Sequence, residues 1–281
     1  MIEVGKKNTL KVVRKTDLGY MVSDGASEIL MHYKESDHEL EVGQEVLVYV
    51  YTDKEDRKTA TMRKPHLLMD EPAFVSVVNI LPGIGVFVDN HTPKDLFISK
   101  DYLPYDEALW PIVGDILFCG LKMKKTSLVA KPVNRFDITS LGEKKRYAEQ
   151  EKVEAFVCHI ALKGMGLITK DLVYVFVPNT QYRNKYRLGE AVLVVITKML
   201  DNEAYGTLNE HKEVLMEDDK ILILNYLKTH QGSMMLTAKS SSEEIEKVFN
   251  MSRKAFKRAY GALYKEHLID FDDKKTFLVK L

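Results

Sequence analysis

The sequence has 281 residues, of which 45% are hydrophobic and 29% are charged, as is usual for a folded protein. Its 41 basic and 41 acidic side chains cancel, which excludes a polycation and requires any basic surface to be local. No run of 18 apolar residues and no apolar signal core occur, so neither a membrane span nor export is expected. Cys119 and Cys158 lack partners at metal-ligand spacing, which predicts two reduced thiols and a cytoplasmic protein.

A strand-rich pattern recurs three times before the sequence turns helical. In each copy a glycine precedes a short apolar strand: Gly19, Gly85 and Gly166. Further on, an apolar residue and a second glycine precede a longer strand, and these glycines, 43, 114 and 189, are 71 and 75 residues apart. This period is too long for a solenoid repeat and suits a small complete β-domain.

Each copy offers five short strands with a longer connection after the third. Strands are expected at 9–15, 20–23, 28–32, 46–52 and 59–62 in repeat one; at 73–81, 85–88, 94–99, 116–124 and 126–130 in repeat two; and at 152–162, 166–169, 172–178, 191–199 and 204–208 in repeat three. The pattern is typical of a five-stranded OB-type barrel, and an SH3-like barrel is the alternative.

The linkers and the last part of the chain complete the predicted organisation. Linker 136–151 is highly charged, is expected to hold a short helix at 142–150, and would let repeat three sit apart. Helices are expected at 218–229, at 241–249 with Ser240 and Glu243 as its capping box, and at 253–267, followed by a hairpin over 268–281. This is winged-helix order. The predicted domains are 1–64, 72–135 and 151–210 for the three barrels and 214–281 for an α+β winged helix.

No catalytic constellation stands out. The sequence contains no Gly-rich phosphate loop, no paired His-Glu metal motif and no Cys-His cluster. His91 with Asp89 and Asp95 is the nearest approach to a metal site, and a solvated loop explains these residues better. We therefore expect no enzymatic activity, no cofactor and no metal, with a nuclease as a remote alternative.

Aromatic and basic side chains favour single-strand binding, because OB barrels bind nucleic acid on strands two and three. The expected contacts are Arg14, Tyr20, His32 and Tyr33 in repeat one; Phe87, beside Phe97, with Lys122 and Lys124 in repeat two; and Tyr182, Arg183 and Lys185 in the connection of repeat three. Half of the residues of a barrel strand face the core, so packing is an equal alternative for each aromatic.

The third expected helix carries a basic surface. Its cations Arg253, Lys254, Lys257 and Arg258 lie in an acid-free stretch, 252–265, while Phe256, Ala259 and Leu263 share one apolar face. A recognition helix of this kind contacts phosphates or a major groove. Winged helices also dock proteins, which is the alternative here.

With these modules placed, the chain resembles the conserved virulence factor B family, in which S1-like barrels precede a winged helix. The resemblance covers essentially the whole chain and implies non-enzymatic RNA binding that influences bacterial gene expression. The S1 pattern is aromatic-Gly-x-aromatic on strand two and a histidine ending strand three. Phe87 retains the second aromatic and His32 the histidine, whereas repeat three has neither and shows Pro178 at the histidine position.

Because no repeat has the full S1 set, we expect weak contacts that add up by tethering, which raises avidity by about 10²–10⁴. The leading hypothesis is multivalent binding of single-stranded RNA. One alternative is a regulator that binds duplex DNA through the winged helix. Another is a scaffold that docks proteins on the ribosome or polymerase. No membrane partner is expected.

Overall fold

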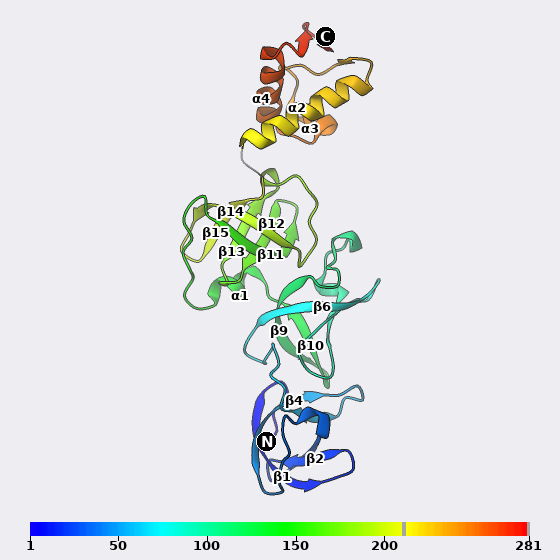
Figure 1. Cartoon of the computed structure of the whole chain (residues 1–281), viewed down its shortest axis with the longest axis vertical. Helices are drawn as coiled ribbons and strands as arrows, with labels where there is room; N and C mark the ends of the chain where they lie inside the picture. Colours follow the sequence, from blue (N-terminus) through cyan, green and yellow to red (C-terminus); the bar gives the residue numbers. More distant parts are fainter. Residues whose placement is uncertain (210–211, 280–281) are drawn as a thin grey trace. The chain divides into compact units, whose positions relative to one another are not determined.

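The computed structural model describes residues 1–209 and 212–279, without the side chains of 212–218, so the expected domain and hairpin ends at 210 and 281 lie outside the described residues. The chain divides into two compact units. One comprises Met1–Val177 and Lys185–Gly206, and the other comprises Pro178–Asn184 and Thr207–Leu281. Figure 1 shows their elements. No helix within the described residues is long and apolar enough to cross a membrane.

Three five-stranded β-modules make up the first unit. Barrel 1 contains β1 (Lys7–Lys15), β2 (Gly19–Ser23), β3 (Glu28–His32), β4 (Glu45–Thr52) and β5 (Lys58–Thr61). Barrel 2 contains β6 (Ala73–Leu81), β7 (Gly85–Val88), β8 (Leu96–Ser99), β9 (Ile116–Lys124) and β10 (Ser127–Pro132). Barrel 3 contains β11 (Lys152–Ala161), β12 (Gly164–Thr169), β13 (Tyr174–Pro178), β14 (Ala191–Met199) and β15 (Glu203–Thr207).

The strand order identifies the OB topology. Barrels 1 and 3 close in the orders β1-β2-β3-β5-β4 and β11-β12-β13-β15-β14. Their third and fifth strands pair in parallel, as Leu30 with Thr59 and Phe176 with Tyr205. Barrel 2 has the same order as an open sheet, β10-β9-β6-β7-β8, with β8 lying beside β10. The predicted barrels are confirmed as OB-type.

The glycine that opens the second strand of barrels 1 and 2 permits a close backbone approach. A Cβ on Gly19 would lie 2.2 Å from the carbonyl oxygen of Met31, and one on Gly85 would lie 2.1 Å from that of Ile98. A real Cβ cannot approach so closely, so only glycine fits where strand two crosses strand three. In these two barrels the recurring glycine therefore reflects the same packing constraint.

The prediction of a helix at 142–150 was wrong. The helix of this linker is α1 (Arg135–Ser140), which begins where the Asn134 side chain accepts a hydrogen bond from the Asp137 backbone N–H. Residues 142–150 are held in an irregular path, because Lys144 donates to the Ile138 and Leu172 carbonyls. These contacts of Lys144 with other parts of the chain decide the backbone path of 142–150, and the charged local sequence from which a helix was predicted does not.

The expectation that repeat three sits apart was also wrong. Phe118 of β9, Ile138 of α1 and Phe156 of β11 share one buried cluster. The Arg187 guanidinium donates to both oxygens of the buried Asp115 carboxylate, at 2.7 and 2.9 Å. Barrels 2 and 3 are therefore joined by apolar packing and by a bidentate ion pair.

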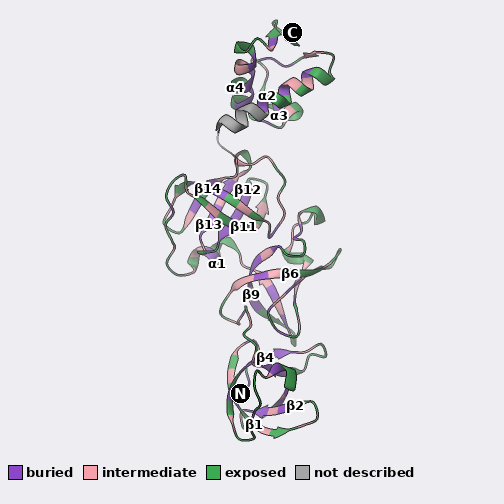
Figure 2. Cartoon of the chain, in the orientation of Figure 1, coloured by how far each residue is buried: buried purple, intermediate pink, exposed green. Residues whose placement is uncertain are grey.

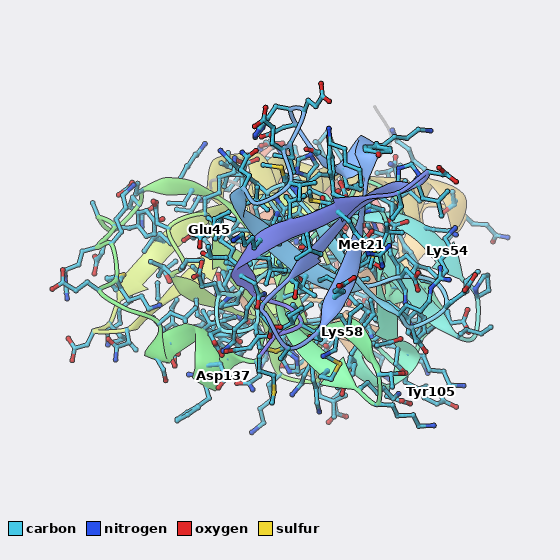
Figure 3. All side chains as sticks on the ribbon, turned by 90° about the horizontal axis from the view of Figure 1, so that it is seen from below. Met21, Glu45, Lys54, Lys58, Tyr105 and Asp137 are labelled. Carbon is cyan, nitrogen blue, oxygen red and sulfur yellow. The ribbon has the colours of Figure 1, made fainter. Side chains whose placement is uncertain are left out.

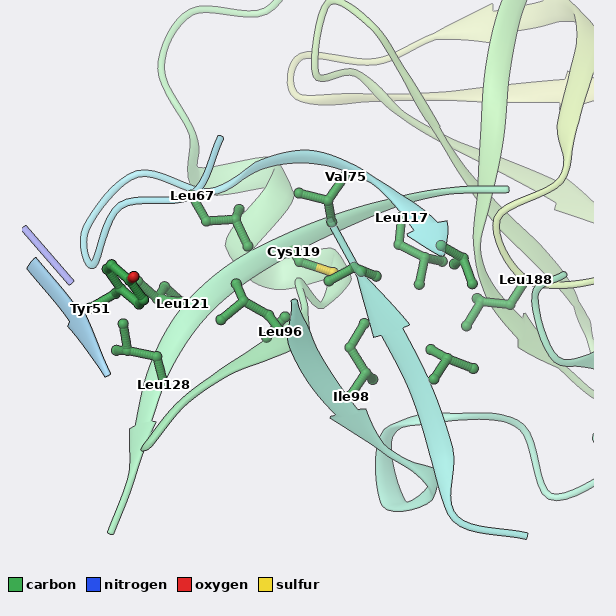
Figure 4. Packing of buried hydrophobic residues seen from close by; sticks show 14 of the residues in the cluster. Tyr51, Leu67, Val75, Leu96, Ile98, Leu117, Cys119, Leu121, Leu128 and Leu188 are labelled. Atoms are coloured by element: carbon green, nitrogen blue, oxygen red, sulfur yellow. The ribbon is translucent and has the colours of Figure 1, made fainter. Parts of the chain in front are cut away.

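Barrels 1 and 2 share a further apolar cluster. Tyr51 of β4 and Leu67 of the connecting segment pack with Leu96, Leu121 and Leu128 of barrel 2 (Figure 4). Figure 2 shows buried residues running through the strands of each module. The connections between repeats are therefore packed segments.

The second unit contains the winged helix. Its elements are α2 (Lys212–Thr229), β16 (Ser233–Met234), α3 (Ser242–Phe249), α4 (Arg253–Lys265), β17 (Ile269–Phe271) and β18 (Thr276–Leu278). The capping box of α3 is formed by Ser241 and Glu244, one residue later than predicted. Phe256, Ala259 and Leu263 of α4 are buried in its core, as the sequence predicts.

Candidate nucleic-acid interface

An aromatic pair lies on the outer face of barrel 2. In the β7–β8 ladder, Val86 and Ile98 are buried, while Phe87 and Phe97 oppose each other on the other face and are half-buried. Their ring centres are 5.3 Å apart. This is the face on which OB barrels bind single strands, and we call these two residues the barrel-2 platform.

Three lysines lie on the outer side of β9 and β10, and of these two strands β10 lies beside β8 of the platform. Lys122 pairs with Val129 and Lys131 pairs with Gly120 in the β9–β10 ladder, while the alternating Leu121, Leu128 and Ala130 are buried; the third lysine is Lys124. None of the three forms an ion pair with a residue in the described ranges. Barrel 2 therefore combines half-exposed rings with unpaired cations, the chemistry that single strands require.

Barrel 1 presents aliphatic side chains at the matching positions. Met21 and Leu30 oppose each other on its outer face, whereas Tyr20 and Met31 are buried. Tyr20 is 3% exposed, and its hydroxyl accepts a hydrogen bond from the Leu40 backbone N–H at 3.0 Å. The assignment of Tyr20 as a base-stacking residue was therefore wrong, because its ring is part of the barrel core.

The other predicted residues of barrel 1 have partners within the protein. Arg14 forms an ion pair with Glu28 at 3.1 Å. His32, half-buried at the end of β3, accepts a hydrogen bond through Nδ1 from the Lys34 backbone N–H. Tyr33 is exposed, but its hydroxyl donates to the Thr16 carbonyl at 2.7 Å. Their arrangement favours a structural role over a nucleic-acid contact.

In barrel 3 part of the corresponding surface is covered. Ile168 and Tyr174 occupy the outer positions of β12 and β13, and both are buried against Ile138 of α1. The Arg135 guanidinium lies 5.3 Å from the centre of the Tyr174 ring. Burial raises the Tyr174 pKa. No single strand can reach these positions while α1 is in place.

Barrel 3 has an aromatic pair of its own, which begins two residues beyond Tyr174 on β13. Phe176 of β13 and Tyr205 of β15 are neighbours in the parallel ladder, with ring centres 5.9 Å apart, and both are partly exposed. Arg135 is neutralised nearby by Glu203, whose hydrogen bond raises the Arg135 pKa. Sequence reasoning missed this pair because the parallel pairing of strands three and five is not visible in a strand pattern.

The predicted basic connection 181–187 is divided between two structural roles. Arg183 forms an ion pair with Asp219 of α2, which is 1% exposed. Arg187 is bound to Asp115, whose hydrogen bond raises the Arg187 pKa. Burial raises the pKa of Tyr182, and Lys185 is exposed. Two of the three cations in this stretch therefore stabilise the fold.

Helix α4 carries its predicted cations on the solvent side. Arg253, Lys254, Lys257 and Arg258 are all exposed, whereas Ala255, Phe256 and Ala259 of the same helix are buried. These four cations form no ion pair with any residue that the structure describes. The N-terminal half of α4 is therefore a local positive surface on a neutral chain.

No group of three potential metal-ligating side chains occurs within the described residues. Nδ1 of His91 lies 2.8 Å from the Lys64 carbonyl oxygen. Cys119 is buried and Cys158 half-buried, and neither forms a disulfide.

Three OB barrels, of which barrel 2 has an aromatic pair on its outer face, and a winged helix with a basic α4 define a protein built from nucleic-acid-binding modules. Three family models match: an S1 domain at residues 4–63, the first S1-like domain of CvfB at 73–129, and a CvfB-like winged helix domain at 221–278. The chain belongs to the conserved virulence factor B (CvfB) family, as its resemblance predicted.

Relatives match along most of the chain. A Bacillus subtilis protein, "Uncharacterized protein YitL", is 34% identical over 93% of this chain and 89% of that protein. Conserved virulence factor B of Staphylococcus aureus is 29% identical over 87% and 82%. A solved multidomain protein with nucleic acid binding domains from Streptococcus pneumoniae has a TM-score of 0.64 and 25% identity, covering 98% of both chains.

Proposed function

We propose that this protein is a non-enzymatic, cytoplasmic RNA-binding protein that holds single strands at several weak contacts and thereby influences bacterial gene expression. The observation that supports this most is the half-exposed barrel-2 platform, together with three lysines without ion pairs on the outer side of β9 and β10 in the same barrel. Phe87 and Phe97 stack on bases, and Lys122, Lys124 and Lys131 contact phosphates. The name of the Staphylococcus aureus relative supports the regulatory part.

The other contacts in this proposal are the Phe176–Tyr205 pair of barrel 3 and the basic surface of α4. Each stacked base contributes about 1–3 kcal/mol, and tethering of the modules raises the avidity of weak contacts. Barrel 1 contributes least, because its outer face is aliphatic and Arg14 is already paired.

Salt dependence tests the proposal directly. Fluorescence anisotropy of a labelled RNA 20-mer, measured with the full chain over a salt series, should give micromolar or tighter binding at low salt. Three phosphate contacts predict a slope of log K against log salt of about −2, and seven, with α4 included, about −5. Absence of binding at every salt concentration rejects the proposal.

A second candidate is a regulator of duplex DNA, which the four exposed cations of α4 favour. In that case Lys257→Glu with Arg258→Glu abolishes duplex binding, while Phe87→Ala leaves it unchanged. If the α4 variant binds duplex DNA like the unmodified protein, this candidate fails.

A further inference from the structure

A second aromatic and cationic group lies on barrel 2, beyond the platform. Tyr102 ends the short 3-10 helix Lys100–Tyr102 that follows β8, and it is 40% exposed. The ammonium nitrogen of Lys131 lies 5.7 Å from the centre of its ring. Lys131 is half-buried and pairs with no carboxylate in the described part of the chain. Neither the Tyr102 ring nor the Lys131 side chain belongs to the apolar core of the barrel.

The strand beside Lys131 leaves an open surface. Gly120 is opposite Lys131 in the β9–β10 ladder and faces outward, between the buried Cys119 and Leu121. A Cβ on Gly120 would meet no atom within 4 Å, and its backbone is not in the left-handed region. The fold therefore does not require glycine here, although glycine weakens a strand interior. Such a glycine marks a place where a ligand approaches the backbone closely.

The geometry joins these residues to the platform. Phe97 and Ser99 lie on the outer side of β8, which runs beside β10, so Lys131 is reached by continuing along the same face. A ring accepts a base, an adjacent unpaired cation accepts a phosphate, and the bare backbone at Gly120 leaves room for the chain between them. A small anion without a base would bind the lysine alone, so the exposed ring beside it favours a nucleotide as the ligand.

We propose that Tyr102, Lys131 and Gly120 form a further nucleotide subsite of barrel 2, with the base on Tyr102 and the phosphate at Lys131. This inference rests on the proposed function and extends its single-strand footprint past Phe97 towards the connection between β8 and β9. Tyr105, labelled in Figure 3, follows in the same connection and is fully exposed.

Binding of fluorescein-labelled U12 RNA by the full chain tests the subsite through four variants. Tyr102→Ala should weaken binding about 5- to 150-fold, and Tyr102→Phe should restore it, because stacking needs the ring alone. Lys131→Ala should reduce the magnitude of the salt slope by about 0.7, the loss of one phosphate contact. Gly120→Val should weaken binding while the melting temperature stays equal or rises, because valine favours strands.

Lys7→Ala is the matched control, because Lys7 is exposed on β1 and forms no ion pair with a described residue. It should leave the slope unchanged. If Phe87→Ala weakens binding but the Tyr102, Lys131 and Gly120 variants bind like the unmodified protein, the subsite is wrong and the proposed function stands. Loss of affinity in Lys131→Ala without a change of slope also overturns it. If the unmodified chain binds no single strand, the proposed function itself fails.

Discussion

Truncation of Phe87 is the sharpest perturbation of the barrel-2 platform. Phe87→Ala removes one ring from a half-exposed pair whose centres are 5.3 Å apart. A lost stacked base costs about 1–3 kcal/mol, so the Kd should rise about 5- to 150-fold. The lost cross-strand pair should cost the fold about 0.5–1.5 kcal/mol. These two effects are separable, because one is measured with RNA and the other by thermal unfolding.

Anisotropy with a labelled RNA 20-mer measures the first effect, and a double-mutant cycle with Phe97→Ala extends it. Because the rings touch, the two substitutions should not be additive, with a coupling of about 0.5–3 kcal/mol. Tyr33→Ala is the matched aromatic control, since Tyr33 is hydrogen-bonded to the Thr16 carbonyl in barrel 1. A Kd unchanged by Phe87→Ala but raised by Tyr33→Ala would refute the reasoning.

Three further predictions concern two ion-paired side chains and one thiol. Arg183→Gln should destabilise the winged-helix unit by about 3–5 kcal/mol in urea unfolding, because it leaves the buried Asp219 carboxylate unpaired; unchanged stability contradicts this. The Cys158 thiol, whose pKa burial raises to about 12, should react with a disulfide reagent far more slowly in the native than in the unfolded chain; equal rates would disprove it. The Asp171 carboxyl has a lowered pKa because Tyr147 and Lys145 donate to it, so its stabilisation is present above the unfolded pKa and is lost as the pH falls through the folded one. Asp171→Asn should therefore lower the melting temperature at pH 7 but have little effect near pH 2, and an equal loss at both would count against it.

The sequence predicted the modules well because their signals are local. Alternating apolar residues and turn glycines depend only on neighbours in the chain. The spacing of Gly43, Gly114 and Gly189 shows where this local pattern starts again. The face on which an aromatic lies was harder to predict, because a shift of one residue reverses it. When the two repeats are aligned on Gly19 and Gly85, Tyr20 matches the buried Val86 and Met21 matches Phe87. The repeat itself therefore contained the signal that Tyr20 faces inward.

Long-range pairing was beyond such patterns. Arg183 and Arg187 look alike in the sequence, yet their partners Asp219 and Asp115 lie 36 and 72 residues away. The covering of Tyr174 by α1 likewise depends on Ile138 packing across modules. Which cations remain unpaired, and which rings remain exposed, is decided by these contacts.

The central claim is that single strands are bound at several weak contacts, led by barrel 2. Displacement of labelled RNA from the full chain by unlabelled single-stranded RNA, single-stranded DNA and duplex DNA, over a salt series, tests it most directly. The account predicts that single-stranded RNA competes best, and that its advantage over the duplex persists as salt weakens all binding, because base stacking is not screened. Duplex DNA competing better than either single strand at every salt concentration would contradict it.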